Sequence, residues 1–349
     1  MRIVVVGATG NVGTSLLEAL ADEPRVESVL GLARRLPELE LPKVEWARAD
    51  VSRDDLVPHV RGADCVVHLA WKIQPSRARD ELRMTNVHGS SRVFHAAAEA
   101  RVPALVYASS VGAYSPGPKD RCVDESWPTN GIRASLYSRH KAEVERILDR
   151  FERDRPETRV VRLRPGLTFK REAASGIRRL FAGPFLPSPL LHPRLLPLVP
   201  DLPRLRFQAV HSRDVGEAYR MAIVGDASGP FNVAAEPVLD PPELARLLGA
   251  RRVRIPEPLA RGAMTLTWRL RLQPTPPGWL ELALGVPLLD ASRARMELGW
   301  EPQRGAGEAL LEVLEGIRQG AGAPTPPLDP SRNGPARVRE LAGGLGSRE

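Results

Sequence analysis

The sequence predicts an α/β fold in which a doubly wound parallel sheet is followed by a smaller C-terminal lobe. Apolar, β-branched runs alternate with helical patterns through the first half of the chain, and strands separated in this way form parallel sheets. A glycine-rich turn joins the first strand to the first helix. With 349 residues, the chain is long enough for one large domain and a second lobe.

The first half carries the clearest secondary-structure signals. The run at residues 3–6 is purely β-branched, as expected of a strand buried on both faces. Further strands are predicted at residues 26–33, 44–49, 64–70, 104–109 and 159–163. Helices are predicted between them at residues 12–21, 77–100 and 135–151.

After Gly166 the alternation of strands and helices fails. The segment 180–205 is apolar but holds seven prolines, and because proline breaks helices we expect a surface loop or lid there. Strands at 207–211 and 231–233 and a helix at 213–224 are expected to return to the main sheet. Further helices are predicted at residues 242–248, 259–271, 292–298 and 306–319.

These patterns predict a dinucleotide-binding domain and a substrate-binding lobe. The domain comprises residues 1–166, with 207–235 returning to it, and the lobe and its lid comprise 167–206 and 236–319. From residue 321 the chain is rich in Gly, Pro, Ser and Arg and poor in apolar residues. We therefore expect residues 320–349 to be a disordered tail.

Composition argues against several classes of partner. The net charge is +8, but only five of the 50 basic residues are lysines and the arginines are scattered among 42 acids. Because no basic cluster contains interleaved aromatic residues, we expect no nucleic-acid partner. No apolar run reaches the ~18–20 residues of a membrane-spanning helix, so no membrane partner is expected.

Cysteine and histidine usage bears on compartment and on metals. The two cysteines, Cys65 and Cys122, argue against a disulfide framework, and a cytoplasmic location follows as the default. The seven histidines show no metal-ligand spacing with one another or with the cysteines, so no metal site is expected.

The turn after the first strand has the features of a phosphate-binding loop. Glycine allows a tight turn and close approach of a pyrophosphate to backbone N–H groups, and the following helix N-terminus faces the anion. This order of strand, glycines and helix is typical of a Rossmann-type sheet. The residues expected to contact a dinucleotide here are Gly7, Thr9, Gly10, Asn11, Val12 and Gly13.

The end of the second strand bears on which dinucleotide is bound. An acid at this position would hydrogen-bond the adenosine ribose and favour NAD, but the chain has Ala33, Arg34 and Arg35. Guanidinium groups pair well with a 2′-phosphate, so we favour NADP(H) over NAD(H). The alternative is that both are surface residues of an arginine-rich chain.

The third predicted strand ends beside the expected position of the adenine. Asp50 and Val51 follow this strand and are placed to meet the base. A solvent-exposed aspartate at a strand end explains Asp50 nearly as well.

Tyr137 and Lys141 lie four residues apart in a predicted helix and therefore share one face. A free phenol has a pKa near ~10, and a neighbouring ammonium group lowers that value. Such a tyrosine can exchange a proton with a carbonyl or alcohol oxygen while hydride moves at a nicotinamide. Ser109 and Ser110 end the fifth predicted strand, where one hydroxyl could hold the substrate oxygen.

Several stretches of the chain occur in a characteristic order. They are Gly-Ala-Thr-Gly-Asn-Val-Gly (7–13), His-Leu-Ala (68–70), Asn-Val-His-Gly (86–89), Tyr-Ala-Ser-Ser-Val-Gly-Ala-Tyr (107–114), Tyr-Ser-Arg-His-Lys-Ala-Glu (137–143) and Arg-Pro-Gly (164–166). In these motifs the chain resembles the extended short-chain dehydrogenases/reductases, the superfamily that includes the NAD-dependent epimerases and dehydratases. The resemblance covers about residues 1–318 and is strongest up to residue 166.

The resemblance implies roles for individual residues. Ser110 matches the catalytic serine, Tyr137 the acid/base and Lys141 the lysine that also holds the nicotinamide ribose. It also implies that a homodimer can form through the helices predicted at 77–100 and 135–151. Further positions implied near the active site or the cofactor are Asn86, Leu69, Ala70, Pro165 and Gly166.

The chain departs from the sugar-modifying members of this superfamily at three places. Tyr114 is followed by Ser115 rather than glycine, Leu167-Thr168-Phe169-Lys170 follows the Arg-Pro-Gly motif, and Ala33 replaces the acid after the second strand. The first hypothesis is therefore an NADP(H)-dependent reductase or dehydrogenase acting on a carbonyl or secondary alcohol of a small molecule. A nucleotide-sugar epimerase or dehydratase with tightly bound NAD is the alternative, and a non-catalytic dinucleotide sensor is the third.

Overall fold

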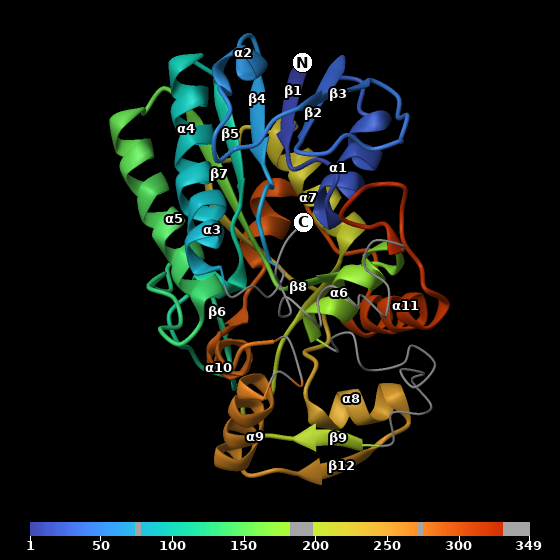
Figure 1. The fold of residues 1–349 in the computed structure, drawn as a ribbon. Helices are drawn as coiled ribbons and strands as arrows, with labels where there is room; N and C mark the ends of the chain where they lie inside the picture. The colour runs from blue at the N-terminus through green and yellow to red at the C-terminus, as the bar shows by residue number, and fades with distance from the viewer. Residues whose placement is uncertain (74–77, 182–197, 271, 273–274, 331–349) are drawn as a thin grey trace.

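The computed structural model describes residues 1–73, 78–181, 198–270, 272 and 275–330. A parallel seven-stranded sheet lies at its centre, in the order β11-β7-β5-β4-β1-β2-β3 (Figure 1). The predicted doubly wound α/β fold is confirmed. The strands of this sheet are Arg2–Val6 (β1), Ser28–Ala33 (β2), Val44–Arg48 (β3), Cys65–His68 (β4), Ala104–Ala108 (β5), Arg159–Pro165 (β7) and Gly229–Val233 (β11).

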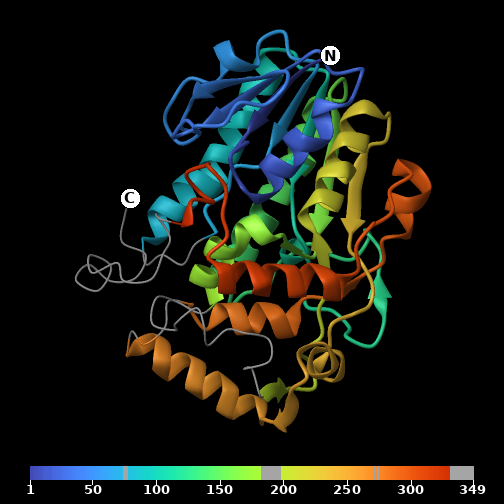
Figure 2. The same cartoon turned by 90° about the vertical axis from the view of Figure 1, so that its right-hand side faces the viewer.

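Helices cover both faces of the sheet, as the views in Figures 1 and 2 show. On one face α1 (Asn11–Ala21) packs beside α7 (Ser212–Val224). The other face is covered by α4 (Gly89–Glu99) and α5 (Leu136–Asp154). The short α2 (Val57–Val60) follows β3.

The apolar run of β1 explains why the sheet is buried on both faces. Ile3 and Val5 belong to the core beneath α1 and α7, whereas Val4 and Val6 belong to the core beneath α4 and α5. Successive side chains of a strand point to opposite faces, so a strand between two helical layers must be apolar at every position.

The single long helix predicted at 77–100 is interrupted by a π-helical turn. It consists of α3 (Arg79–Arg83), the π-helix Met84–His88 and α4. Such π turns are frequent at functional sites, and this one contains Asn86.

Apart from α7 and β11, the described second half of the chain contributes strands to three small sheets and forms five α-helices. Figure 1 shows most of these elements below the carboxyl ends of the main strands. The strand pairs are β8 (Leu167–Phe169) with β10 (Ala209–His211), β9 (Leu198–Asp201) with β12 (Arg251–Arg254), and β6 (Cys122–Val123) with β13 (Leu288–Leu289). The helices are α6 (Ala174–Phe181), α8 (Pro241–Leu248), α9 (Glu257–Arg269), α10 (Gly278–Gly285) and α11 (Ala306–Gln319).

Two predictions for this half need correction. The strand predicted at 207–211 pairs with β8 in a separate sheet, and of the segment 207–235 only β11 joins the main sheet. Helix α7 and the residues Ala209 and Val210 of β10 pack in the core on one face of that sheet. The chain changes sheet just after Pro165, which ends β7 and has no N–H of its own to donate. Gly166 then bonds to Val233 and Leu167 to Gln208.

The first residues of the predicted disordered tail are packed. Thr325 and Leu328 are 1% and 4% exposed, and the hydroxyl of Thr325 bonds to Thr9 of the glycine-rich loop. The rest of that tail, 331–349, lies outside the described residues, as does 182–197 of the predicted lid. Among the helices that are described, none has the length and apolar character needed to cross a membrane.

Candidate active site

The candidate site lies where the strand order reverses, between β1 and β4. From β1 the sheet continues to β2 and β3 on one side and to β4, β5 and β7 on the other. Parallel sheets of this kind bind ligands at the carboxyl ends of the strands next to such a reversal. In Figure 1 these ends face the C-terminal lobe.

The loop after β1 is shaped by two glycines that no other residue could replace without movement. Gly7 has a φ of 89°, and a Cβ there would lie 2.6 Å from the backbone nitrogen of Ala70. A Cβ on Gly13 would lie 2.5 Å from the carbonyl oxygen of Ala8. Because neither residue has a Cβ atom, the loop can lie against the end of β4 and α1 can lie close to the sheet.

Gly10 begins α1 and leaves its first turn available to an anion. It is the N-cap residue, and no side chain caps the helix. A Cβ on Gly10 would meet only the carbonyl oxygen of Gly7, at 3.5 Å, so its outer side is open. Free N–H groups at a helix N-terminus bind phosphate well, and the loop therefore fits the pyrophosphate of a dinucleotide.

A buried lysine behind this loop was not identified from the sequence. The ammonium of Lys170 donates to Thr14 Oγ1 at 2.6 Å and to Ser15 Oγ at 3.0 Å, both on α1. Burial lowers the pKa of Lys170. Its position just after β8 gave no sequence signal, because the contact joins segments about 155 residues apart.

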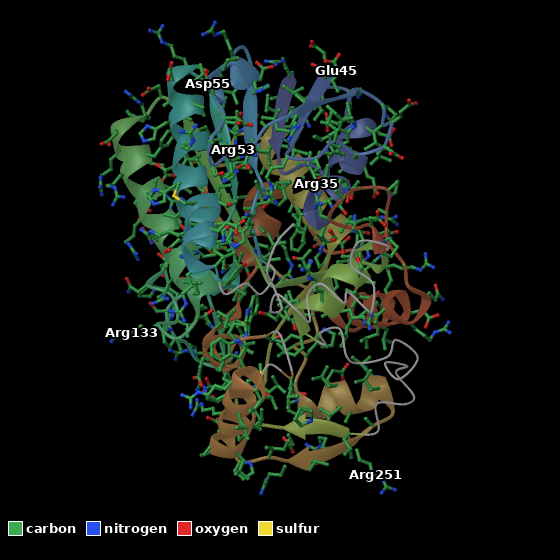
Figure 3. The ribbon with its side chains drawn as sticks, viewed as in Figure 1. Arg35, Glu45, Arg53, Asp55, Arg133 and Arg251 are labelled. Carbon is green, nitrogen blue, oxygen red and sulfur yellow. The ribbon has the colours of Figure 1, made fainter. Side chains whose placement is uncertain are left out.

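The end of β2 brings Arg34 close to Asp50. Ala33 is buried, while both arginines that follow it are exposed, and Figure 3 labels Arg35 on the ribbon of this region. Asp50 Oδ1 accepts hydrogen bonds from the backbone and hydroxyl of Ser52, at 2.9 and 2.7 Å. Burial alone would raise the pKa of Asp50, but the bonds from Ser52 and then the charge of Arg34 lower it.

Asn86 holds the chain that follows β4. Its Oδ1 accepts from the backbone nitrogen of Lys72 at 2.8 Å, and its Nδ2 donates to the carbonyl oxygen of Lys72 at 3.0 Å. This pair of bonds fixes the segment after Leu69 and Ala70, and with it the side chain of Trp71. Asn86 is 2% exposed, so it positions the backbone from beneath the site.

His68, at the end of β4, is a neutral structural residue. Its Nε2 lies 2.8 Å from Ser90 Oγ, and that hydroxyl donates to the carbonyl oxygen of Asn86 at 2.6 Å. Because the hydroxyl proton is committed to Asn86, His68 must donate from Nε2. Burial, aided by the charge of Lys141, lowers the pKa of His68 to about 3.

Ser110 and Tyr137 are held together by the turn after β5. Ser110 Oγ accepts a 3.0 Å hydrogen bond from the backbone nitrogen of Gly112. A Cβ on Gly112 would lie 2.7 Å from Cε1 of Tyr137 and 3.4 Å from Ser110 Oγ. Only glycine at position 112 therefore lets the tyrosine ring lie against the serine.

Ser138 fastens the start of α5 to the same turn. Its hydroxyl donates to the carbonyl oxygen of Gly112 at 2.5 Å and accepts from the backbone nitrogen of Ile132 at 2.6 Å. Ser135 caps the helix by accepting from the nitrogen of Ser138. The turn and the helix thus form one unit that fixes the tyrosine.

Burial, rather than the neighbouring lysine, dominates the acidity of Tyr137. Burial raises its pKa to about 12, and the hydroxyl of Ser110 acts in the opposite direction. The sequence predicts that the ammonium of Lys141 lowers this pKa, but in the structure that group points elsewhere. It donates to the carbonyl oxygen of Ala108 at 2.5 Å and lies 3.6 Å from the ring centre of Trp71.

Lys141 itself is buried without a direct carboxylate partner in the described part of the chain. Burial lowers its pKa to about 7, against the opposing effect of Glu145. A carbonyl oxygen and an aromatic face stabilise an ammonium group less than an ion pair does. The ammonium group of Lys141 can therefore donate further hydrogen bonds to acceptors such as ribose hydroxyls.

Two tryptophans that the sequence analysis did not identify flank Tyr137. Trp71 meets the tyrosine ring edge-on with centroids 6.0 Å apart, and Trp279 stacks on it at 5.3 Å with planes 30° apart. They come from the segment after β4 and from α10. The ring of Tyr137 thus lies in apolar, aromatic surroundings, which accounts for the raised pKa of its hydroxyl.

A buried ionic network lies beneath the serines. Glu145, 0% exposed, pairs with Arg164 at 2.9 Å and with Arg162 at 2.8 Å, and accepts from Ser109 Oγ at 2.5 Å. Burial alone would raise the pKa of Glu145, but the charges of Arg164 and Arg162 lower it to about 2. Ser109 thus faces the network, which leaves Ser110 as the serine beside the tyrosine.

Pro165 and Gly166 end β7 at the same edge of the sheet. A Cβ on Gly166 would lie 2.6 Å from the carbonyl oxygen of Gln208, so the small residue lets β8 begin close to β10. Across the described residues, no group of three or more His, Cys, Asp or Glu side chains is placed to hold a metal ion.

Comparison with known proteins identifies a family and several relatives. Residues 3–180 match the sequence model of the NAD dependent epimerase/dehydratase family. An L-arabinose 1-dehydrogenase (NAD(P)(+)) of Haloferax volcanii is 36% identical over 110 residues, 31% of this chain and 41% of that protein. A decarboxylating sterol-4-alpha-carboxylate 3-dehydrogenase of Candida albicans is 26% identical over 190 residues, 50% and 54% of the two chains. The chain thus spans about half the length of these relatives.

Solved structures are similar over a longer stretch. A short-chain dehydrogenase/reductase superfamily protein from Agrobacterium tumefaciens with bound NAD is 23% identical, with a TM-score of 0.66 over 91% of this chain and 98% of that one. A UDP-glucose 4-epimerase from Thermus thermophilus in complex with NAD is 22% identical, with a TM-score of 0.65 over 91% and 99%. At these identities the likeness establishes the fold.

Proposed function

The chain belongs to the NAD-dependent epimerase/dehydratase family, and on that premise we propose that it is an NAD(P)-dependent oxidoreductase for a carbonyl or secondary alcohol. The observation that carries this proposal is the close packing of Tyr137 against Ser110, with Lys141 one helical turn away. Named dehydrogenases among its relatives support the same reaction class.

The glycine loop and its surroundings are the proposed cofactor site. Gly7, Gly10 and the first turn of α1 would hold the pyrophosphate, and Lys141 the nicotinamide ribose. Arg34 and Arg35 would favour NADP(H) by pairing with a 2′-phosphate. The bound nicotinamide supplies or accepts the hydride.

The side chains of the site perform the proton transfer. Because the pKa of Tyr137 is about 12, its hydroxyl carries a proton at neutral pH and can donate it to a carbonyl oxygen as that oxygen gains charge. Ser110 Oγ donates a hydrogen bond to the same oxygen and stabilises the developing charge. Lys141 favours the phenolate that remains, once its ammonium reaches the ribose.

The proposal is tested by turnover and by the identity of the bound nucleotide. A Tyr137→Phe variant should lose about 10²–10⁴-fold in kcat on any carbonyl substrate that the wild type reduces, while its affinity for the cofactor stays the same. Full turnover by this variant would exclude the assignment. Mass analysis of nucleotide released on denaturation separates the alternatives, because retained NAD would favour an epimerase or dehydratase.

A further inference from the structure

Helix α9 has an apolar face that belongs to none of the buried core clusters formed by the described residues. None of its side chains is buried, although Ala260, Ala263, Met264 and Thr267 follow the i, i+3, i+4, i+7 spacing of a single helix face. In globular proteins a face with this spacing normally contacts the interior.

This face forms one wall of a cavity of about 420 Å³ that is widely open to solvent. Figure 1 shows α9 beside β9 and β12 in the C-terminal lobe. The cavity is lined by α9, by Pro200 of β9 and by Ile255, which follows β12. The volume falls in the range of small-molecule sites, roughly 300–1,000 Å³. Its lining residues outside α9 are Pro200, Leu202, Ile255, Leu272 and Leu280.

The lining presents almost no polar group to a ligand. No charged side chain contributes to it. Its one hydroxyl, on Thr267, donates to the carbonyl oxygen of Ala263 at 2.7 Å within the helix. A diphosphate or a sugar would lose its hydration here without new hydrogen bonds, whereas an apolar group gains by leaving water.

Helix α10 connects the cavity with the proposed reaction centre. Trp279 stacks on Tyr137 with ring centroids 5.3 Å apart, and the next residue, Leu280, lines the cavity. Adjacent helical residues point in directions about 100° apart, so this helix forms part of both sites. The pocket and the proposed reaction centre therefore lie beside the same short helix.

We propose that this cavity binds the apolar portion of the substrate while the carbonyl group reaches Tyr137. The substrate class is then a largely hydrocarbon ketone or alcohol with an aliphatic chain or an apolar ring system. This inference rests on the proposed function for the reacting end of the molecule. The binding of the apolar end depends on the cavity alone and can be measured separately.

The first experiment measures binding without turnover. The neutral fluorescent probe N-phenyl-1-naphthylamine should bind the wild type, and long-chain 2-alkanones should displace it. Burial of one more methylene should tighten competition about fourfold until the cavity is full. If the affinity of the competing 2-alkanones did not change with chain length, the proposal would be overturned.

Variants on α9 locate the bound probe. Ala263→Glu places a charge in the lining, and Ala260→Trp fills the space, so each should weaken probe binding at least about tenfold. Leu266→Glu is the matched control, because Leu266 is 57% exposed on the same helix and does not line the cavity. If Leu266→Glu alone abolished binding, the probe would occupy the exposed leucines of α9, and the cavity assignment would fail.

Turnover distinguishes this inference from the proposed function. If the probe binds as expected but no ketone is reduced, the cavity stands and the oxidoreductase proposal falls. The opposite outcome is also informative. If Tyr137→Phe abolishes ketone reduction, the enzyme assignment stands. If Ala263→Glu and Ala260→Trp then reduce ketones of every chain length as fast as the wild type does, the cavity proposal falls.

Discussion

The hydroxyl of Thr325 donates a 2.9 Å hydrogen bond to the carbonyl oxygen of Thr9, across 316 positions of sequence. Thr9 belongs to the glycine loop, so the segment after α11 braces the proposed pyrophosphate site. Both side chains are buried, at 1% and 5% exposure. The C-terminal segment is therefore part of the proposed cofactor site, although it lies beyond every motif that identifies the family.

Replacing Thr325 with valine tests this bracing role. The change preserves shape and leaves the Thr9 oxygen without its partner, which should cost about 1–3 kcal/mol. We expect a lower melting temperature and weaker binding of the dinucleotide, measured by thermal denaturation and by titration. Thr325→Ser keeps the hydroxyl and should bind the cofactor nearly as well as the wild type. Equal cofactor affinity in the valine and serine variants would contradict a role for this bond.

The two arginines after β2 predict a cofactor preference. The double variant Arg34→Ala, Arg35→Ala should bind NADP(H) about 10- to 100-fold more weakly, because one or two charge-assisted hydrogen bonds are lost. Its affinity for NAD(H) should stay unchanged. Arg251→Ala, Arg254→Ala is a control of equal charge change at the far end of the C-terminal lobe, where Figure 3 labels Arg251. If NADP(H) and NAD(H) affinities of the Arg34, Arg35 variant both matched the wild type, the preference would be refuted.

Local patterns predicted the parts of the site that depend on neighbouring residues. The order of strand, glycines and helix at residues 2–21 can be read directly, since its conformation is set by β-branching and by the absence of Cβ atoms. The spacing of Tyr137 and Lys141 likewise needs only helical geometry. The orientation of the lysine was not predictable, because Trp71 and Ala108 reach it from other segments.

The remainder of the site depends on contacts between distant segments. Trp279 lies in α10, which the sequence analysis did not predict, since its residues are apolar without a clear helical period and prolines precede it. The packing of Thr325 was hidden by a composition typical of disorder. In both cases tertiary contacts decided a structure that local propensity left open.

The buried ammonium of Lys141 predicts a pH dependence of stability. Its pKa falls from 10.5 to about 7 on burial, so between these values the unfolded chain binds the proton and the folded chain does not. Stability from this group therefore rises with pH across that range. The melting temperature of the cofactor-free wild type, relative to Lys141→Met, should increase from pH 7 to pH 10. A difference that is constant across this range would mean that Lys141 titrates normally.

Glu145 and Glu143 offer a matched pair on helix α5. Glu145 is fully buried between two arginines, whereas Glu143 pairs with Arg83 at 28% side-chain exposure. Removing one partner of a buried ion pair leaves an uncompensated charge and costs about 3–5 kcal/mol, but an exposed pair contributes only about 0–1 kcal/mol. In chemical denaturation, Glu145→Gln should lower the free energy of unfolding by about 3–5 kcal/mol, and Glu143→Gln by no more than about 1 kcal/mol.

The acid dependence of these two variants completes the test. Because the charges of Arg164 and Arg162 overcome burial and lower the pKa of Glu145 from 4.5 to about 2, its stabilising effect is present above pH 4.5 and is lost as the pH falls towards 2. The gap in unfolding free energy between the wild type and Glu145→Gln should therefore narrow in that window. The carboxylate charge of Glu145 holds Ser109 and the two arginines in place. If the difference in unfolding free energy persisted at pH 2, the variant would be destabilised by altered packing and not by the loss of this charge.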